Sequence, residues 1–435
     1  MRAFTLGLVA VIATGCGVAT TEGAERRSRE RLSADLQRAV APAGLRTHLA
    51  ALQRIADANG GHRAAATPGF AESVRYVRTV LVRAGYRVRV TSFPYVRYVE
   101  QLERARQVAP VERAFAVEAF EYSPSTPTGG VRGQVVASGD GCQASDFASL
   151  DGKIALIRRG TCFFAVKSRN AARAGAVAAI VFNNEDGPLD GTLGSAGAIP
   201  TVAVTRAVGA SLAGDGVTVS LEIRARTIRT RAQNVVADTG ARPGRVLIVG
   251  GHLDSVTAGA GIDDNATGVA ALLEIARVLR RLDSGHHVRF GFWGAEESGL
   301  WGSRAYAQVA VNRRGVVGYL NFDMLGAPDY VRGVYRGPFA QVFERHFARL
   351  GLQSRTIDIS GRSDHASFAA VGIPVGGLFS GGDPCYHRAC DRLANVNQRA
   401  LHELADATSH AVAMLAPHWA KDRETRRQRP RSGRL

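Results

Sequence analysis

The apolar positions of this chain repeat with two different periods, and the two periods alternate along the sequence. Segments 45–55 and 74–82 carry apolar residues at the three- and four-residue spacing of an amphipathic helix, whereas 86–90 alternates in the manner of a strand. Two short apolar runs, 246–249 and 288–293, have the uninterrupted hydrophobicity of buried parallel strands. Helices and strands in this arrangement predict an α/β fold, here a doubly wound mixed sheet with helices on both faces.

The longest helical pattern lies between these two apolar runs. Apolar residues recur from Val269 to Leu279, and Asp264 and Asn265 just before them are suitable N-cap residues. A last helix is predicted near 397–415. Because the carboxyl ends of neighbouring parallel strands face one crevice, polar residues that follow these strands are expected to meet there.

The pattern changes between about 111 and 226, where short strands and glycine-rich turns replace the longer elements, so that one domain is interrupted by another. The predicted parts are a signal and lipobox segment at 1–21, a charged leader at 22–44, one domain made of 45–110 and 227–416, an inserted β-rich module at 111–226, and a basic tail at 417–435. The leader is expected to remain unpacked as far as about Leu32, since it is rich in charged and small residues.

The first residues have the features of an export signal. A lone basic residue, Arg2, precedes an apolar stretch at 4–13 that is too short to span a bilayer. Residues 13–16, Ala-Thr-Gly-Cys, resemble a bacterial lipobox, which predicts lipidation of Cys16. The protein is therefore expected outside the cytoplasm, either secreted or anchored to a membrane through Cys16.

Four of the five cysteines lie beyond this segment, and an oxidising compartment would make them disulfide candidates. Cys142, Cys162, Cys385 and Cys390 allow three pairings, of which proximity in sequence favours Cys142–Cys162 and Cys385–Cys390. A thiolate zinc site needs closer spacing, such as Cys-x2-Cys, which none of these pairs has. Two disulfides are therefore predicted.

The formal net charge of +17 raises the question of nucleic-acid binding. The charge comes almost entirely from arginines that are scattered along the chain, and no basic motif interleaved with aromatic residues is present. We therefore predict a basic surface and no nucleic-acid partner.

Histidines and carboxylates follow the predicted strands or lie in glycine-rich loops. The set consists of His252, Asp264, Glu296, Glu297, Asp323 and His387. Imidazole and carboxylate groups without thiolates suit zinc in a catalytic role, and a shared carboxylate permits two ions about 3.5–4 Å apart. A second carboxylate beside a metal ligand is what a general base requires.

The motifs around these residues resemble those of the M28 zinc aminopeptidases, in particular the bacterial secreted leucine-type enzymes. The similarity spans about 233–415, with 45–95 also fitting, and is carried by GHLDSV, GIDDNATG, FWGAEESGLWGS, YLNFDMLG, SDH and CYHRACD. It implies a zinc-exopeptidase-like fold and an enzyme that binds two Zn²⁺ ions. Its substrates would be the N-termini of peptides or proteins, with a preference for apolar residues, and we expect a monomer.

The resemblance also implies roles for individual residues. The expected zinc ligands are His252, Asp264 and Asp323 for one ion, and Asp264, Glu297 and His387 for the other. Asp264 would then bridge the two ions, Glu296 would be the general base, and Tyr386 would stabilise the oxyanion. Asp323 and Glu296 would hold the free amine of the substrate, and Asp254 would orient the His252 imidazole from outside the metal shell.

Further expectations concern the surroundings of this site. Arg362 is a candidate for contact with the substrate main chain, and His365 for lining the pocket. The Asp264–Asn265 peptide is expected to be cis by the same resemblance. His286 and His287 precede a strand and are expected to be exposed. Whether a structural calcium ion is present is left open.

A second resemblance concerns the inserted module. GKIALIRRGTCFFAVKSRNAARAGAVAAIVFNN, followed by AIPTVAVTRAVGASL, closely resembles the protease-associated (PA) domain that is inserted into several peptidases. The succession is a strand, an Arg-Gly-x-Cys-x-Phe turn, a helix, a second strand and an Ile-Pro-x-Val-x-Val strand.

Other functions remain open at this stage. Carboxypeptidase, dipeptidase or glutaminyl-cyclase activity is compatible with similar folds, and a peptide-binding relative could keep the fold without catalysis. Cyclases use one zinc ion and non-catalytic relatives lose ligands, whereas this chain keeps all five ligand positions. An aminopeptidase is therefore the favoured interpretation.

Overall fold

A computed structural model describes residues 16–187, 189, 191–240, 244–282, 284–358 and 361–417. The signal segment as far as residue 15 and the basic tail from 418 onward lie outside the described residues. The chain divides into two compact units: residues up to 93 together with those from 232 onward, and Pro94–Arg231 between them. The inserted unit is therefore wider than the predicted 111–226, because β1 (Arg87–Ala109) continues into it as one long strand.

The first unit is built on a mixed sheet whose strands run in the order β13-β12-β14-β11-β9-β10-β8. These strands are β8 (Thr218–Asp238), β9 (Val246–His252), β10 (Val288–Trp293), β11 (Val316–Phe322), β12 (Gly333–Tyr335), β13 (Arg355–Ile357) and β14 (Val375–Phe379). The central pairs β10–β9, β9–β11 and β11–β14 are parallel, whereas β8 and β12 join antiparallel. Every residue of β9 is buried, as its apolar run predicts.

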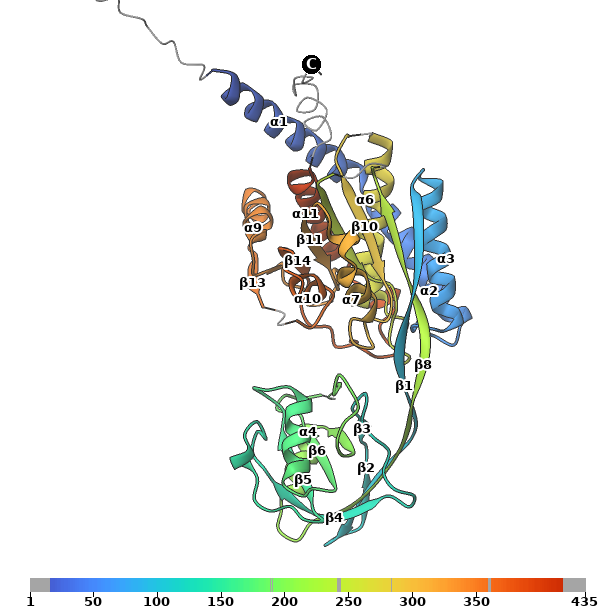
Figure 1. Cartoon of the computed structure of the whole chain (residues 1–435), viewed down its shortest axis with the longest axis vertical. Coiled ribbons are helices and arrows are strands. Elements are labelled where there is room, and N and C mark those ends of the chain that lie inside the picture. Colours follow the sequence, from blue (N-terminus) through green and yellow to red (C-terminus); the bar gives the residue numbers. More distant parts are fainter. Residues whose placement is uncertain are drawn as a thin grey trace, which may run out of the picture. The chain divides into compact units, whose positions relative to one another are not determined.

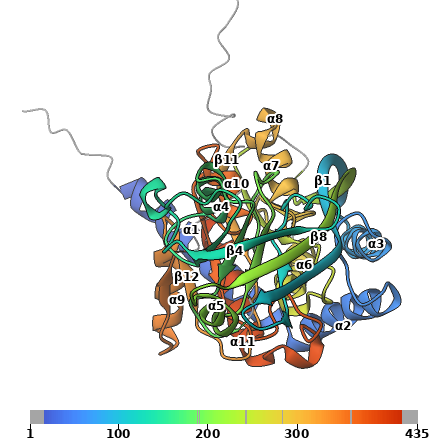
Figure 2. The same cartoon turned by 90° about the horizontal axis from the view of Figure 1, so that it is seen from below.

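Helices cover both faces of this sheet, as Figure 1 shows. They are α1 (Cys16–Ala39), α2 (Pro42–Ala58), α3 (Pro68–Arg83), α6 (Thr267–Leu282), α7 (Trp301–Gln308), α8 (Ala310–Arg313), α9 (Ala340–Arg349), α10 (His365–Ala369) and α11 (Gln398–Leu415). On one face α6 and α11 contact β9, and α2 and α3 pack outside α6, side by side in Figures 1 and 2. On the other face, Tyr306 of α7 and Phe368 of α10 join a core with Trp293 and Tyr319.

The leader segment forms α1, which begins upstream of the predicted start of ordered structure near Leu32 and packs against α11, but the first of its described side chains to be buried is Leu32. Leu32 and Leu36 on α1 and Val40 directly after it recur every four residues and are buried. This narrow apolar stripe is sufficient to dock a helix that is otherwise rich in charged and small residues.

The second unit has its own parallel sheet. Its elements are β2 (Arg113–Phe115), β3 (Glu118–Ala119), β4 (Val131–Ala137), β5 (Ile154–Arg158), α4 (Phe164–Arg173), β6 (Ala178–Phe182), β7 (Thr201–Val204) and α5 (Arg206–Leu212). Strands β4, β5, β6 and β7 pair in parallel in this order, and β3 closes the edge antiparallel to β7. The strand, turn, helix and strand succession predicted for a PA-like module is present, and Cys142 and Cys162 form the predicted disulfide.

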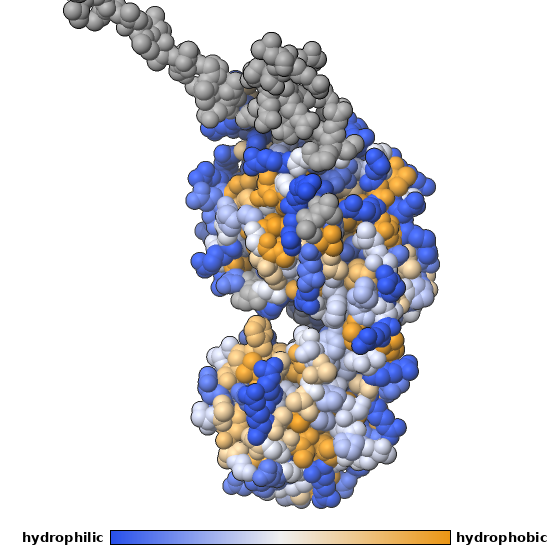
Figure 3. Space-filling view, in the orientation of Figure 1, coloured by the Kyte–Doolittle hydropathy of each residue, from blue (hydrophilic) through white to orange (hydrophobic). Residues whose placement is uncertain are grey.

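Hydrophilic side chains are spread over the visible face of each unit and alternate with apolar ones (Figure 3). Within the described part of the chain, no helix has both the length and the apolar character needed to cross a bilayer.

Candidate active site

The site residues come from the carboxyl ends of three adjacent parallel strands. His252 is the last residue of β9, Glu296 and Glu297 follow β10, and Asp323 follows β11. Strand β9 lies between β10 and β11, so these ends are neighbours. The strand pattern of the sequence therefore predicted this convergence.

Asp264 lies in a tight turn, Ile262–Ala266, between β9 and α6. The Asp264–Asn265 peptide is cis, as predicted. The backbone N–H groups of Asp263 and Asp264 donate to the carboxylate of Asp391, at 2.7 and 3.1 Å. The Asn265 side chain accepts from the N–H of Gly268 at 2.9 Å and so caps the start of α6.

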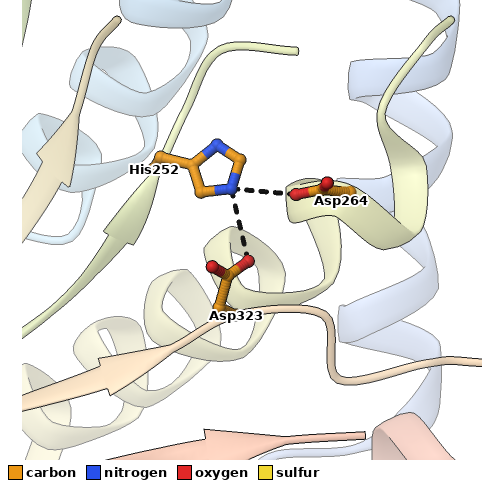
Figure 4. Close-up of side chains that lie close together, drawn as sticks. All are labelled: His252, Asp264 and Asp323. Atoms are coloured by element: carbon orange, nitrogen blue, oxygen red, sulfur yellow. Dashed lines mark hydrogen bonds and ion pairs between the residues drawn. The ribbon is translucent and has the colours of Figure 1, made fainter. Parts of the chain in front are cut away.

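Three of the side chains form a first cluster, shown in Figure 4. His252 Nε2 lies 2.9 Å from Asp264 Oδ1 and 3.2 Å from Asp323 Oδ1. The other oxygen of Asp323 accepts a hydrogen bond from the Ser363 hydroxyl at 2.5 Å. Ser363 therefore leaves Asp323 Oδ1 directed toward the cluster.

A second cluster uses the other side of Asp264. His387 Nε2 lies 3.4 Å from Asp264 Oδ2 and 3.0 Å from Glu297 Oε2. In each cluster, one ligand atom per residue lies within 4.8 Å of the others. Asp264 thus presents a different carboxylate oxygen to each cluster.

The donor atoms fit a pair of cations better than they fit one another. His387 Nε2 and Glu297 Oε1 are buried without a hydrogen-bond partner, although the His387 ring nitrogen is close to two carboxylates. The ring nitrogen and carboxylate oxygens of the second cluster therefore converge as ligands around a common centre do, whereas in the first cluster His252 Nε2 is also within hydrogen-bond distance of Asp323 Oδ1. Imidazole and carboxylate donors in sets of three suit zinc with an open coordination position.

The electrostatics of the cluster require positive charge. Burial opposes ionisation of His252, but the carboxylates of Glu296 and Asp323 raise the pKa of His252 well above its ordinary value. Burial raises the pKa of Glu296 well above its ordinary value, against the effect of His252, and Asp364 raises it further. The buried carboxylates therefore hold protons on their neighbours unless cations neutralise them.

Asp254 contacts both the His252 ring and the backbone of the two glutamates. Nδ1 of His252 lies 3.1 Å from the backbone carbonyl of Asp254 but 3.9 Å from its carboxylate. The Asp254 carboxylate accepts the backbone N–H groups of Glu296 and Glu297, at 3.2 and 3.4 Å. The carboxylate therefore holds the backbone of the two glutamates and also remains within ion-pair distance of the imidazole.

The loop that carries Tyr386 and His387 is closed by the predicted Cys385–Cys390 disulfide. The Tyr386 ring stacks on His387 with centroids 3.8 Å apart, and 44% of the Tyr386 surface is exposed. Tyr386 is therefore open to a substrate beside the second cluster.

The remaining predictions have different outcomes. Arg362 is exposed and His365 half-buried, with the His365 ring in edge contact with Tyr335. His286 and His287 are buried, contrary to the prediction. The backbone of His287 donates to Pro417, and its ring lies 3.1 Å from Asp238, because β8 and the segment after α11 cover this strand end.

Three buried residues around the site were not predicted. Ser363 and Asp391 stand within or next to motifs that were recognised, so their position gave a usable signal. Arg63 gave none, since it is one of 55 basic residues and lies far from the motifs in the sequence.

Family models and curated relatives match most of this chain. The model of peptidase family M28 matches residues 234–412, and that of the PA domain matches 131–212. An aminopeptidase of Pseudomonas aeruginosa is 37% identical over 424 residues, which cover 84% of this chain and 79% of that protein. The chain belongs to peptidase family M28. A probable lipoprotein aminopeptidase of Mycobacterium tuberculosis, LpqL, is 34% identical and covers 94% of this chain and 92% of its own length.

Solved structures of M28 proteins share the fold. An aminopeptidase from Aneurinibacillus sp. strain AM-1 superposes with a TM-score of 0.75 at 30% identity, covering 89% of this chain and 96% of that one. BSAP, a zinc aminopeptidase from Bacillus subtilis, matches in fold with a TM-score of 0.67 at 24% identity, over 85% and 94%. The predicted family, fold class, PA domain and enzyme class, an M28 aminopeptidase, are thereby confirmed.

Proposed function

We propose that this M28 aminopeptidase uses two zinc ions to remove N-terminal, mainly apolar, residues from peptides outside the cytoplasm. The observation that carries the proposal is the carboxylate of Asp264, which offers one oxygen to each of two ligand clusters. The proposed ligands are His252, Asp264 and Asp323 on one side, and Asp264, Glu297 and His387 on the other.

When bound, zinc would supply Lewis acidity for the scissile carbonyl and for the attacking water. Glu296 belongs to neither cluster, yet it is buried directly beside Glu297. Its carboxylate would accept the proton of the attacking water and return it to the leaving amine. Asp254 fixes the backbone from which Glu296 projects, which limits the positions that this base can take.

Recognition of the substrate's free amine would restrict cleavage to the N-terminal residue of a peptide. A protonated amine is attracted by Asp323 and Glu296, two buried carboxylates that follow the strands on either side of β9. Tyr386, exposed and stacked on His387, would donate its hydroxyl proton to the developing oxyanion. Arg362 is proposed to contact the substrate main chain.

The decisive experiment compares leucine p-nitroanilide with its N-acetylated form. Purified protein with added zinc should hydrolyse the free-amine compound and leave the blocked one intact, and a chelator should abolish the activity. Equal cleavage of both compounds, or release of residues from peptide C-termini, would refute the aminopeptidase assignment.

Attachment to a membrane through Cys16 is proposed on the lipobox-like segment and on the similarity to LpqL, which is described as a lipoprotein. Replacing Cys16 by Ser should move the protein from the membrane fraction to the soluble exported fraction. Unchanged partitioning would leave ordinary secretion as the explanation.

A further inference from the structure

Arg63 is a fully buried arginine that the mechanism above does not use. It lies in the connection between α2 and α3, far in sequence from every predicted site residue, and has no exposed surface. Burying a guanidinium is costly unless its N–H groups are satisfied, so its partners indicate its purpose.

Those partners are backbone carbonyls of one loop. Nε donates to Ala260 at 2.9 Å, Nη2 to Gly261 at 2.6 Å, and Nη1 to Leu253. The backbone N–H of Arg63 also donates to the Ser255 hydroxyl at 2.9 Å. A single planar side chain is thus bonded to both ends of the loop that joins β9 to the Asp264 turn.

The ends of this loop adjoin two residues of the first cluster. Leu253 follows His252 directly, and Gly261 precedes the turn that contains Asp264. Because the guanidinium is planar and rigid, its bonds to both ends fix the spacing between the backbones of His252 and Asp264.

The loop backbone at Gly261 is tightly packed between Arg63 and Asp264. Its φ is +62°, and a Cβ at this position would lie 2.3 Å from the carbonyl oxygen of Asp264 and 3.2 Å from Nη2 of Arg63. Only a glycine at position 261 can place its own carbonyl within hydrogen-bond distance of Arg63 while the chain turns toward Asp264.

The charge of Arg63 persists in this position. Burial lowers the pKa of Arg63 to about 10, and the carboxylates of Asp254, Asp391 and Glu297 oppose the shift. All three side-chain hydrogen bonds go to carbonyls, so Arg63 acts on the site through backbone geometry rather than by pairing with one carboxylate.

We propose that Arg63 is a positioning residue of the metal centre, which holds the loop between Leu253 and Gly261 and thereby sets the distance between the ligands His252 and Asp264. The proposal rests on the two-metal site of the proposed function. It assigns to the N-terminal segment a part in building a centre whose ligands all come from 252–387.

The test compares three variants of the full chain after removal of metal. Arg63→Met keeps the length of the side chain without its donors. Arg63→Lys keeps the charge but cannot form a planar three-donor fork. Arg289→Met is the matched control, because Arg289 is also largely buried and bonds to Asp238, Tyr306 and Asn312, but at the opposite end of β10.

The readouts are Zn²⁺ affinity from competition with a chelating dye and the visible absorption of bound Co²⁺, which reports ligand geometry. Arg63→Met and Arg63→Lys should both lose about 10–100-fold in Zn²⁺ affinity, the range for residues that support metal ligands, and should alter the Co²⁺ spectrum. Arg289→Met should change neither, even if it lowers thermal stability.

Three results would overturn the proposal. These are unchanged affinity and spectrum in Arg63→Met, full recovery by Arg63→Lys, which would reveal a purely electrostatic role, or equal losses in the Arg289 control. If the unaltered protein binds metal but does not cleave leucine p-nitroanilide, the proposed function fails while the comparison of Arg63 variants still decides the positioning role.

Discussion

Two adjacent glutamates, Glu296 and Glu297, occupy different positions in the site. Glu297 Oε2 lies 3.0 Å from His387 Nε2 and belongs to a ligand cluster, whereas Glu296 belongs to none. Glu296→Gln should therefore retain two zinc ions and lose about 10²–10⁴-fold in kcat, the range for removal of a general base. Zinc content by elemental analysis and kcat for leucine p-nitroanilide measure the two quantities.

Glu297→Gln is the matched control, with the same chemical change one residue away. It should lose a zinc ion, because its carboxylate is a member of the second cluster. If both variants lost the same amount of metal, or if Glu296→Gln turned over normally, the two roles would have been assigned wrongly.

At this scale the sequence predicts residue types and their order, but not orientation. His252, Asp323 and the glutamates follow apolar strands, so their convergence is a property of parallel sheets. The carboxylate of Asp254 was expected at the imidazole and also accepts two backbone N–H groups, at distances that depend on the conformation of the loop after β10. Loop conformation of this kind is not encoded in hydrophobic periodicity.

Among the elements, α9 and α11 bury a pair of stacked histidines with centroids 4.6 Å apart. Burial, together with the charge of Arg349, lowers the pKa of both His346 and His410 to about 4, and the His346 ring contributes to the shift of His410. The hydroxyl of Ser33 on α1 lies 2.9 Å from Nδ1 of His410. The charge of Glu30, on the same helix, raises the pKa of His410 and so opposes the effect of burial.

The unfolded chain takes up these protons near pH 6.5, whereas the folded chain does so near pH 4. The contribution of these two histidines to stability should therefore be present above about pH 6.5 and be lost as the pH drops to about 4, by up to about 3 kcal/mol for a single histidine. His346→Phe should flatten the pH dependence of the free energy of unfolding, measured with urea on metal-free protein. Phe343→Leu, on the same helix, should lower stability without changing that slope; an unchanged slope in His346→Phe would contradict the prediction.

The disulfide-closed loop between Cys385 and Cys390 should matter more for activity than for stability. Its cysteines are 5 residues apart, against 20 for Cys142–Cys162, so loop-closure entropy predicts about 2 kcal/mol for the first and about 3 kcal/mol for the second. Replacing Cys385 and Cys390 by Ser should reduce zinc binding and turnover, because His387 then loses its fixed loop.

The corresponding double Ser variant of Cys142 and Cys162 is the control, and it should lower the melting temperature more while leaving zinc content intact. The reverse ranking of the two variants, in thermal denaturation and zinc analysis, would show that the short loop is held by its other contacts.

The periodicity of the sequence predicted the central strands β9 and β10 and the long helices α2, α3, α6 and α11, but not the short strands β12 to β14, the short helices α7 to α10 or the full extent of α1. Charged residues dominate that segment, and only the stripe at Leu32, Leu36 and Val40 reveals a buried side. A stripe of three apolar residues becomes informative only when the partner surface on α11 is known.

For the molecule as a whole, the inserted unit contains two apolar cores of its own. Both consist entirely of residues between 94 and 231, and include Ile154, Ile180 and Leu221 in one and Phe120 and Ile157 in the other. A fragment spanning 94–231 should therefore fold by itself, with a cooperative thermal transition by circular dichroism. A broad, non-cooperative transition in the oxidised fragment would show that the unit depends on the peptidase domain.

Asp264 has a thermodynamic consequence for the two proposed metal ions. Its two oxygens belong to different clusters, so the charge and orientation of one carboxylate enter the affinity of both positions. Occupancies that share a group are linked, and the coupling is reciprocal: whatever the first ion does to the binding of the second, the second does equally to the first. Titration of the metal-free protein should consequently deviate from two independent identical steps, and the loss of either ion changes the retention of the other.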